Sequence, residues 1–248
     1  MVAIEAIGIA TKALLRRAAR SVGLEIRRAG PCPAESYDLV QRIRERRIAC
    51  VLDVGANVGQ FAQSLRSDGY AGQIYSFEPL GAAFADLQQA ADLDGSWFPL
   101  KVALGAAKEQ RELRIAANSV SSSLLEICPR AVEAEPAARV VGCESVQVET
   151  LDSLMPTLAE FSAPTLLKLD VQGFERQVIA GASQTMQWID AVVIECSLCP
   201  IYEGEWLFGD VVRHFLSTGF RLEHVSPVFV DGRTGEVLQV DSHFWRIR

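Results

Sequence analysis

Short apolar segments alternate with helical segments through most of this chain, and this alternation constrains its fold more than any other feature. The run IACVLDV (48–54) is almost continuously apolar and rich in β-branched residues, as expected of a strand buried on both faces. Further strands are expected at 73–78, 97–104, 111–117, 144–150, 165–171, 191–196, 220–225 and 239–247. Helical segments are expected at 58–67, 80–90, 151–161, 174–188 and 205–217. Strands separated by helices predict an α/β fold, with about seven principal strands in a mostly parallel sheet and helices on both faces.

The last two strands have no helix between them. The segment that joins them contains Asp231-Gly232 and Thr234-Gly235, which are turn signals. Two strands joined by a short turn pair antiparallel. We therefore predict a doubly wound sheet with one antiparallel strand near its end.

The first 47 residues differ from the remainder in charge. They hold ten basic and five acidic side chains, whereas residues 48–248 hold 14 basic and 26 acidic ones. Apolar residues recur at helical spacing over 4–22, which predicts a basic amphipathic helix, and a second helix is expected at about 35–46. We divide the chain into an N-terminal helical leader (1–47) and an α/β domain (48–248). Three roles are open to the leader: packing on the protein, which we favour, homodimer formation, or peripheral contact with an anionic membrane.

The composition disfavours several classes of protein. The 248 residues carry a formal net charge of −7, so the phosphate backbone of a nucleic acid would be repelled. No run of 18 apolar residues is present to span a membrane, and the first residues lack the charge order and cleavage site of a signal peptide. Six irregularly spaced cysteines favour reduced thiols. We expect a cytoplasmic protein that binds no nucleic acid, placed on the inner face of the membrane if the leader contacts lipid.

A glycine-containing turn follows the first strand of the domain, in VLDVGANVG (51–59). Glycines at such a turn let the backbone approach a ligand closely, beside the free N–H groups of the next helix. Asn57 stands where a dinucleotide-binding turn has its second glycine, which disfavours nicotinamide cofactors. The carboxylate of Asp53 would repel a pyrophosphate but attract an ammonium or sulfonium group. The candidate ligand-binding residues of this turn are Asp53, Gly55, Ala56, Asn57 and Gly59.

A glutamate ends the next strand, 25 residues after Asp53. In this position the carboxylate of Glu78 can accept hydrogen bonds from both hydroxyls of a ribose. The alternative without a binding role is that Asp53 caps a helix and Glu78 is a solvent-exposed residue at the end of a strand. The turn and the two acids together favour a nucleoside site.

The chain resembles the FkbM-like family of S-adenosylmethionine-dependent methyltransferases. The matching segments follow the family's order and are VLDVGANVGQF (51–61), YSFEP (75–79), VALG (102–105), SSSLLE (121–126), TLDSL (150–154), LLKLDVQGFERQVIAGA (166–182) and VVIEC (192–196). The resemblance implies the class I methyltransferase fold, Rossmann-like, with strand order 3-2-1-4-5-7-6. It also implies S-adenosylmethionine as the cofactor, with Val102 and Ala103 among the residues beside it. Gln172 stands where many family members have glutamate, so position 172 is a poor candidate for an acid or base.

Two acids at strand ends are the candidate catalytic residues. Asp170 closes a central strand, where open α/β sheets place their ligands, and Glu195 closes the next one. A sugar hydroxyl is scarcely ionised at neutral pH, so methyl transfer to it needs a general base or a metal. We predict Asp170 as the first candidate for the base, with Glu195 as its partner or as a ligand of Mg²⁺. The alternatives are a structural role for Asp170, and catalysis by His224 or His243.

The resulting hypothesis is an O-methyltransferase that acts on a hydroxyl, most plausibly of a sugar in a glycolipid or another secondary metabolite. Its partners would be that small-molecule or glycolipid acceptor and S-adenosylmethionine. Two alternatives stay open: a nicotinamide-dependent oxidoreductase, and a nucleoside-binding regulator without catalytic activity. The serines of segment 118–123 suit hydrogen bonding to a polyhydroxylated acceptor, or form a plain turn.

Overall fold

The computed structural model describes residues 37–158, 161 and 163–247. The chain divides into two compact units, Met1–Asp38 and Leu39–Arg248. The expected amphipathic helix at 4–22 lies outside the described residues, and the described helices and strands all belong to the second unit.

A short helix, α2 (Leu39–Glu45), opens the second unit. Its buried residues Val40 and Ile43 pack with Val51 and Trp245 of the sheet. The second helix expected in the leader thus packs within the compact unit Leu39–Arg248.

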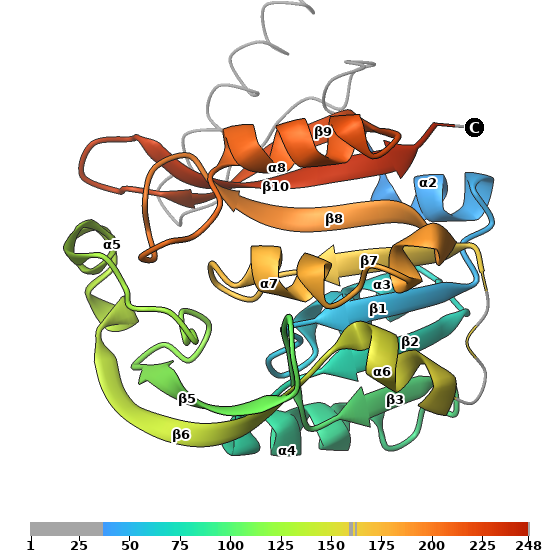
Figure 1. Cartoon of the computed structure of the whole chain (residues 1–248), viewed down its shortest axis with the longest axis horizontal. Coiled ribbons are helices and arrows are strands. Elements are labelled where there is room, and N and C mark those ends of the chain that lie inside the picture. Colours follow the sequence, from blue (N-terminus) through green and yellow to red (C-terminus); the bar gives the residue numbers. More distant parts are fainter. Residues whose placement is uncertain (1–36, 159–160, 162, 248) are drawn as a thin grey trace, which may run out of the picture. The chain divides into compact units, whose positions relative to one another are not determined.

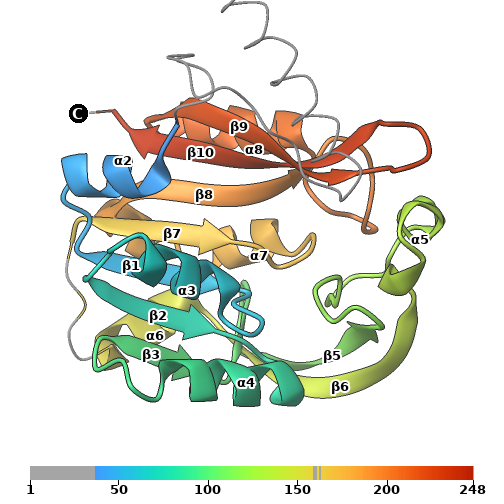
Figure 2. The same cartoon turned by 180° about the vertical axis from the view of Figure 1, so that it is seen from behind.

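Seven strands form the main sheet (Figures 1 and 2). Their order is β3 (Trp97–Leu100), β2 (Gln73–Phe77), β1 (Cys50–Val54), β7 (Thr165–Leu169), β8 (Ile189–Ser197), β10 (Val237–Arg246) and β9 (Phe220–Val230). The pairs from β3 through β8 are parallel, and β10 is antiparallel to both of its neighbours. The strand order and the antiparallel strand confirm the class I methyltransferase fold that the sequence predicted.

Helices cover both faces of the sheet because successive strand residues point to opposite sides. Val51 packs on the face covered by α2, α3 (Gln60–Ser67) and α4 (Gly81–Ala91), which lies in front in Figure 2. Leu52 packs on the opposite face under α6 (Leu151–Leu154), α7 (Glu175–Ala180) and α8 (Phe208–Ser217), in front in Figure 1. The two apolar cores account for the nearly continuous apolar runs of the strands.

A second sheet of three strands lies beyond the carboxyl ends of the parallel strands (Figure 1). It consists of β4 (Ala103–Leu104), β6 (Val140–Glu149) and β5 (Glu109–Ala116) in that order. The expected strand 97–104 is thus two strands in two sheets, because the chain leaves β2 after Leu100 and β4 pairs with β6 instead. The short helix α5 (Pro129–Ala134) was not predicted.

Two expected helices are shorter than predicted. The first, 151–161, is α6 followed by one 3₁₀ turn (Met155–Thr157) that contains Pro156. The second, 174–188, is α7 followed by a separate 3₁₀ turn at Thr185–Trp188. Pro156 lacks the N–H that would continue an α-helix. Within the described ranges, no helix is both long and apolar enough to cross a membrane.

Candidate active site

A cavity of about 370 Å³ opens at the carboxyl ends of β1, β2, β7 and β8. This volume falls within the range of roughly 300–1,000 Å³ typical of small-molecule sites. The cavity contains most of the site residues predicted from the sequence, namely Gly55, Ala56, Asn57, Glu78, Val102, Ala103, Asp170 and Glu195. A strand-end site is therefore present where open α/β sheets place their ligands.

The glycine turn forms one wall of the cavity. The N–H groups of Gly55 and Ala56 donate to the carbonyl oxygen of Phe77, at 3.0 and 3.1 Å, which ties the turn to the end of β2. Gly55 has a φ of +78°, and a Cβ atom there would lie 1.9 Å from the carbonyl oxygen of Asp170. A larger residue would push the turn away from β7. Glycine at position 55 therefore brings the turn and the Asp170 strand end together.

Gly59 has a different role from the one predicted. It is buried and caps α3 at a φ of 87°, but it does not line the cavity. A Cβ atom on Gly59 would lie 2.8 Å from the ring of Trp97. Glycine at this position thus lets α3 pack closely on β3.

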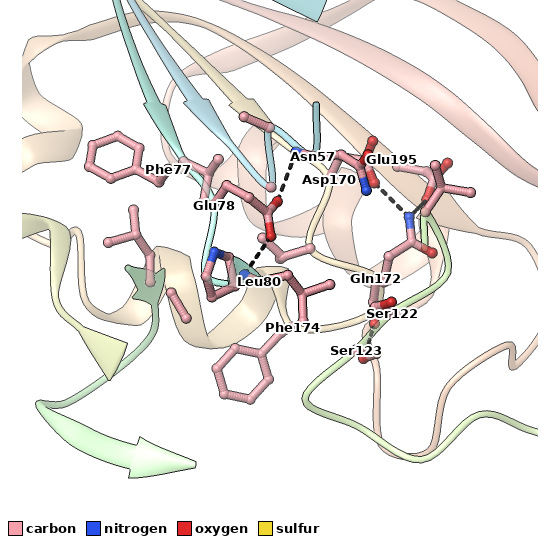
Figure 3. Close-up of a pocket in the computed structure, with 18 of the residues that line it drawn as sticks. Asn57, Phe77, Glu78, Leu80, Ser122, Ser123, Asp170, Gln172, Phe174 and Glu195 are labelled. Atoms are coloured by element: carbon pink, nitrogen blue, oxygen red, sulfur yellow. Dashed lines mark hydrogen bonds between the residues drawn. The ribbon is translucent and has the colours of Figure 1, made fainter. Parts of the chain in front are cut away.

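Glu78 lies at the floor of the cavity with 5% of its surface exposed (Figure 3). Its two carboxylate oxygens accept from the backbone N–H groups of Asn57 and Leu80, each at 2.8 Å. Burial raises the pKa of Glu78, while these two hydrogen bonds lower it. Each carboxylate oxygen has a further lone pair, so the fixed carboxylate can still accept from ligand hydroxyls.

Asp53 is fully buried and does not line the cavity, which differs from the direct contact with a ligand that we expected. It accepts a hydrogen bond from the hydroxyl of Ser76 at 3.1 Å, and its other oxygen lies 3.6 Å from Lys168 Nζ. Lys168 faces Asp53 in the register of β1 and β7 and does line the cavity. Asp53 therefore acts on the site through Lys168.

Polar side chains gather at the opposite end of the cavity, where Figure 3 shows Asp170, Gln172 and Glu195 together. Asp170 accepts from Lys168 Nζ at 3.1 Å and from the amide nitrogen of Gln172 at 2.6 Å. The same amide nitrogen donates to Glu195 at 2.8 Å. Asp241 of β10 is the register partner of Glu195 and completes the group. We call the three carboxylates of Asp170, Glu195 and Asp241, together with the amide of Gln172, the carboxylate cluster.

Burial and repulsion between acids raise the pKa of two members of the carboxylate cluster, Glu195 and Asp241. Burial, followed by the negative charges of Asp170 and Asp241, raises the pKa of Glu195 well above its ordinary value. Burial and the charge of Asp170 raise the pKa of Asp241 to about 6. Burial opposes the charged form of Lys168, but the carboxylates of Asp170 and Asp53 outweigh it and raise its pKa. Lys168 is therefore a permanent cation beside the cluster.

The two histidines considered as alternative bases lie outside the cavity lining. They face each other across β9 and β10, with ring centroids 5.2 Å apart. Burial and the charge of His224 lower the pKa of His243 to about 4, so His243 is neutral at physiological pH. The structure gives neither histidine a place beside the carboxylates.

The donor set does not suit Mg²⁺. Between Asp170 and Glu195 lies the nitrogen of the Gln172 amide, a hydrogen-bond donor, where a metal ion would need a further oxygen. In the described part of the chain, no group of three or more histidine, cysteine, aspartate or glutamate side chains is arranged to hold a metal. The possible role of Glu195 as a metal ligand is unsupported.

Sequence reasoning missed two residues of this site. Asp241 lies in the antiparallel strand, remote from every motif, and only the pairing of β10 with β8 brings it to Glu195. Tyr202 follows β8 in a loop, and its hydroxyl lies 2.6 Å from the Gln172 side-chain oxygen. Neither position carries a local signal, since their neighbours in space are distant in sequence.

Comparison with known proteins agrees with this geometry. The methyltransferase FkbM domain family matches residues 53–222. An FkbM methyltransferase structure from Methylobacillus flagellatus KT shares 14% identity with a TM-score of 0.52, covering 80% of this chain and 44% of the other. This chain thus spans less than half the length of that protein, and the likeness concerns the fold.

More distant structures include two proteins solved with S-adenosylmethionine bound. Magnesium protoporphyrin IX methyltransferase from Synechocystis shares 12% identity at a TM-score of 0.46, covering 87% of this chain and 78% of the other. Fibrillarin from Aeropyrum pernix shares 12% identity at a TM-score of 0.45, covering 79% and 66%. Among curated proteins, none matches. The match over residues 53–222 shows that this chain belongs to the FkbM methyltransferase domain family.

Proposed function

We propose that the protein is an S-adenosylmethionine-dependent O-methyltransferase that acts on a hydroxyl of a sugar or similar polyhydroxylated acceptor. One observation carries the proposal: a single cavity joins the glycine turn and Glu78 to the carboxylate cluster. The first end suits a nucleoside and the second suits a reacting hydroxyl. Bound S-adenosylmethionine would supply an electrophilic methyl group between them.

The nucleoside end fits this cofactor in shape and charge. The buried carboxylate of Glu78 is held by two backbone N–H groups and can accept from both ribose hydroxyls. Val102, Ala103 and Phe174 add an apolar wall for the base. The turn holds Asn57 at a φ of 48°, where a pyrophosphate-binding turn has glycine. These features favour a nucleoside without phosphates over a nicotinamide dinucleotide.

The acceptor end favours a neutral or cationic substrate rich in hydroxyls. Asp170, Glu195 and Asp241 offer acceptors for hydroxyl hydrogens, and their combined charge opposes a phosphorylated substrate. Two half-exposed valines, Val120 (51%) and Val228 (45%), also line the cavity. Apolar side chains there suit a substrate with an apolar portion, such as a glycolipid.

The direct test is transfer of a tritiated methyl group from S-adenosylmethionine to sugars, glycosides and extracted glycolipids. We expect label in a neutral polyhydroxylated acceptor and none in its phosphorylated counterpart. Label in carboxyl or amine groups alone would contradict O-methylation. Binding of S-adenosylmethionine without transfer to any acceptor would support the regulator, and binding of NADH alone would support the oxidoreductase.

A further inference from the structure

Gln172 connects the two candidate catalytic carboxylates without being an acid or base itself. Its side-chain nitrogen donates to Asp170 Oδ1 at 2.6 Å and to Glu195 Oε2 at 2.8 Å. An amide nitrogen has two hydrogens, so both are used, one on each carboxylate. The amide thereby stands between the two carboxylates, with one hydrogen directed at each.

Tyr202 fixes the direction in which this amide points. Its hydroxyl has a single hydrogen, and the nearer of its two acceptors is the side-chain oxygen of Gln172 at 2.6 Å, against 3.1 Å for the backbone oxygen of Ser121. Burial, followed by the nearby carboxylates, raises the pKa of Tyr202, so the hydroxyl keeps its proton and acts as a donor. A donor on the oxygen of Gln172 turns its nitrogen toward Asp170 and Glu195.

Tyr202 is itself held firmly. Its side chain is 1% exposed, and the backbone N–H groups of Ile201 and Tyr202 donate to the carboxylate of Glu205 at 2.5 and 2.9 Å. Gly173, with a φ of +95°, lets the chain pass close to Tyr202, since a Cβ atom at residue 173 would lie 2.8 Å from Tyr202 Cβ. The loop after β8 is therefore built to present this hydroxyl.

The two carboxylates differ in how their oxygens are bonded, since each oxygen of Asp170 accepts one hydrogen bond whereas a single oxygen of Glu195 accepts two. Asp170 receives Gln172 on Oδ1 and the Lys168 ammonium on Oδ2, at 3.1 Å. Glu195 receives Gln172 and Gln239 on the same oxygen, Oε2. Among the described residues, none donates a hydrogen bond to Glu195 Oε1.

We propose that Glu195, and not Asp170, is the proton acceptor of the cavity, and that Tyr202 and Gln172 are positioning residues that hold it ready. This assignment rests on the proposed methyl transfer and reverses the order of the two bases that the sequence favoured. The acceptor O–H bond breaks, its proton passes to Glu195 Oε1, and the freed electron pair forms the new O–C bond. The electron pair of the broken methyl–sulfur bond stays on sulfur.

The charges around Glu195 set the expected pH dependence. Asp170 and Asp241 flank it on the neighbouring strands, Glu175 acts from α7, and Lys168 opposes their effect. Burial first, and then the three acids, raise the pKa of Glu195, and a hydrogen bond donated by Gln172 to the charged carboxylate works against them. Loss of the Tyr202 hydroxyl should loosen that hydrogen bond and move the titration of Glu195 to higher pH.

The test is a carbon-13 NMR titration of the full-length protein, labelled at glutamate and aspartate carboxyl carbons, without and with S-adenosylhomocysteine. The Glu195 signal is assigned by its loss in Glu195→Gln, and that of Asp170 by Asp170→Asn. In the wild type, we expect Glu195 to titrate above the ordinary glutamate range. Tyr202→Phe and Gln172→Leu should raise its midpoint by roughly one pH unit, the size expected for losing a hydrogen bond to a charged group.

Tyr70→Phe is the matched control, because Tyr70 is a buried tyrosine outside the cavity lining whose hydroxyl donates to the backbone oxygen of Gln73, so its loss should leave the Glu195 midpoint unchanged. An unchanged midpoint in a folded Tyr202→Phe variant would overturn the positioning role. A transition carried by Asp170 in place of Glu195 would overturn the assignment of the proton acceptor. No spectral change on addition of S-adenosylhomocysteine would instead contradict the proposed function. The titration of the protein without ligand would then still test whether Tyr202 and Gln172 control the titration of Glu195.

Discussion

The two ends of the cavity are built in different ways. At the nucleoside end, backbone N–H groups of the segments that follow β1 and β2 hold Glu78, and the carbonyl oxygen of Phe77 at the end of β2 holds the glycine turn. At the other end, side chains from β7, β8, β10 and the loop after β8 hold one another. The first end is therefore a local structure, whereas the second forms only when strands far apart in the sequence come together.

The largest effect is expected at the assembled end. Glu195→Gln keeps the shape of the side chain but cannot accept the proton, so methyl transfer should fall roughly 10²–10⁴-fold, as typical for losing a general base. Affinity for S-adenosylmethionine should stay near that of the wild type. Tritium transfer and calorimetry measure the two quantities on the same preparation. Transfer at the wild-type rate would remove Glu195 from the chemistry.

At the nucleoside end, we expect a substitution to weaken cofactor binding while much of the transfer rate is kept, the reverse of Glu195→Gln. Glu78→Ala removes charge-assisted hydrogen bonds to ribose of roughly 1.5–3 kcal/mol each, so affinity should fall about tenfold or more. At saturating S-adenosylmethionine, much of the transfer rate should return. Glu126→Ala, at an exposed glutamate outside the cavity lining, is the control. Equal affinities in Glu78→Ala and the control would contradict the ribose role.

The carboxylate cluster should also lower the stability of the fold at high pH. Burial, then the charge of Asp170, raises the pKa of Asp241 to about 6 in the folded protein, against about 3.9 in the unfolded chain. The folded state then binds the Asp241 proton more tightly than the unfolded chain does. The free energy of unfolding therefore falls as pH rises from about 4 to 6, and this loss remains in full above pH 6. Asp241→Asn should therefore stabilise the protein at pH 8 by about 1–2 kcal/mol, allowing for partial exposure.

Urea unfolding measures this effect. The gain should be absent at pH 4, where Asp241 is protonated in the folded state. Asp86→Asn, at an exposed site on α4, should change stability little at either pH. A pH-independent effect of Asp241→Asn would mean that packing, and not charge, sets its contribution.

The smallest effect is expected outside the α/β unit. Removing residues 1–30 should leave affinity for S-adenosylmethionine unchanged, because the cavity is lined by residues 54–241. Sedimentation with anionic liposomes decides the membrane proposal for the leader. Equal sedimentation of the full-length and shortened proteins would exclude the membrane role and leave packing or homodimer formation.

The sequence predicted the main sheet and the placement of the glycine turn beside Glu78 because both depend on local patterns. Apolar runs mark the buried strands, and the turn with Glu78 lies within a single strand–helix–strand unit. It did not separate β3 from β4, because the end of a strand depends on which neighbour is available. The sequence favoured Asp170 over Glu195 as the base because it cannot show which side chains contact Asp170. The hydrogen bonds that Lys168 and Gln172 donate to Asp170 depend on how the side chains are placed in the fold.

The central claim is that this cavity binds S-adenosylmethionine, and calorimetric titration of the wild-type protein tests it most directly. We expect S-adenosylmethionine and S-adenosylhomocysteine to bind with dissociation constants of about 1 μM to 1 mM, the range typical of enzyme substrates. Glu78→Ala should weaken both, and NADH should not bind. Binding of NADH without binding of S-adenosylmethionine would contradict the account.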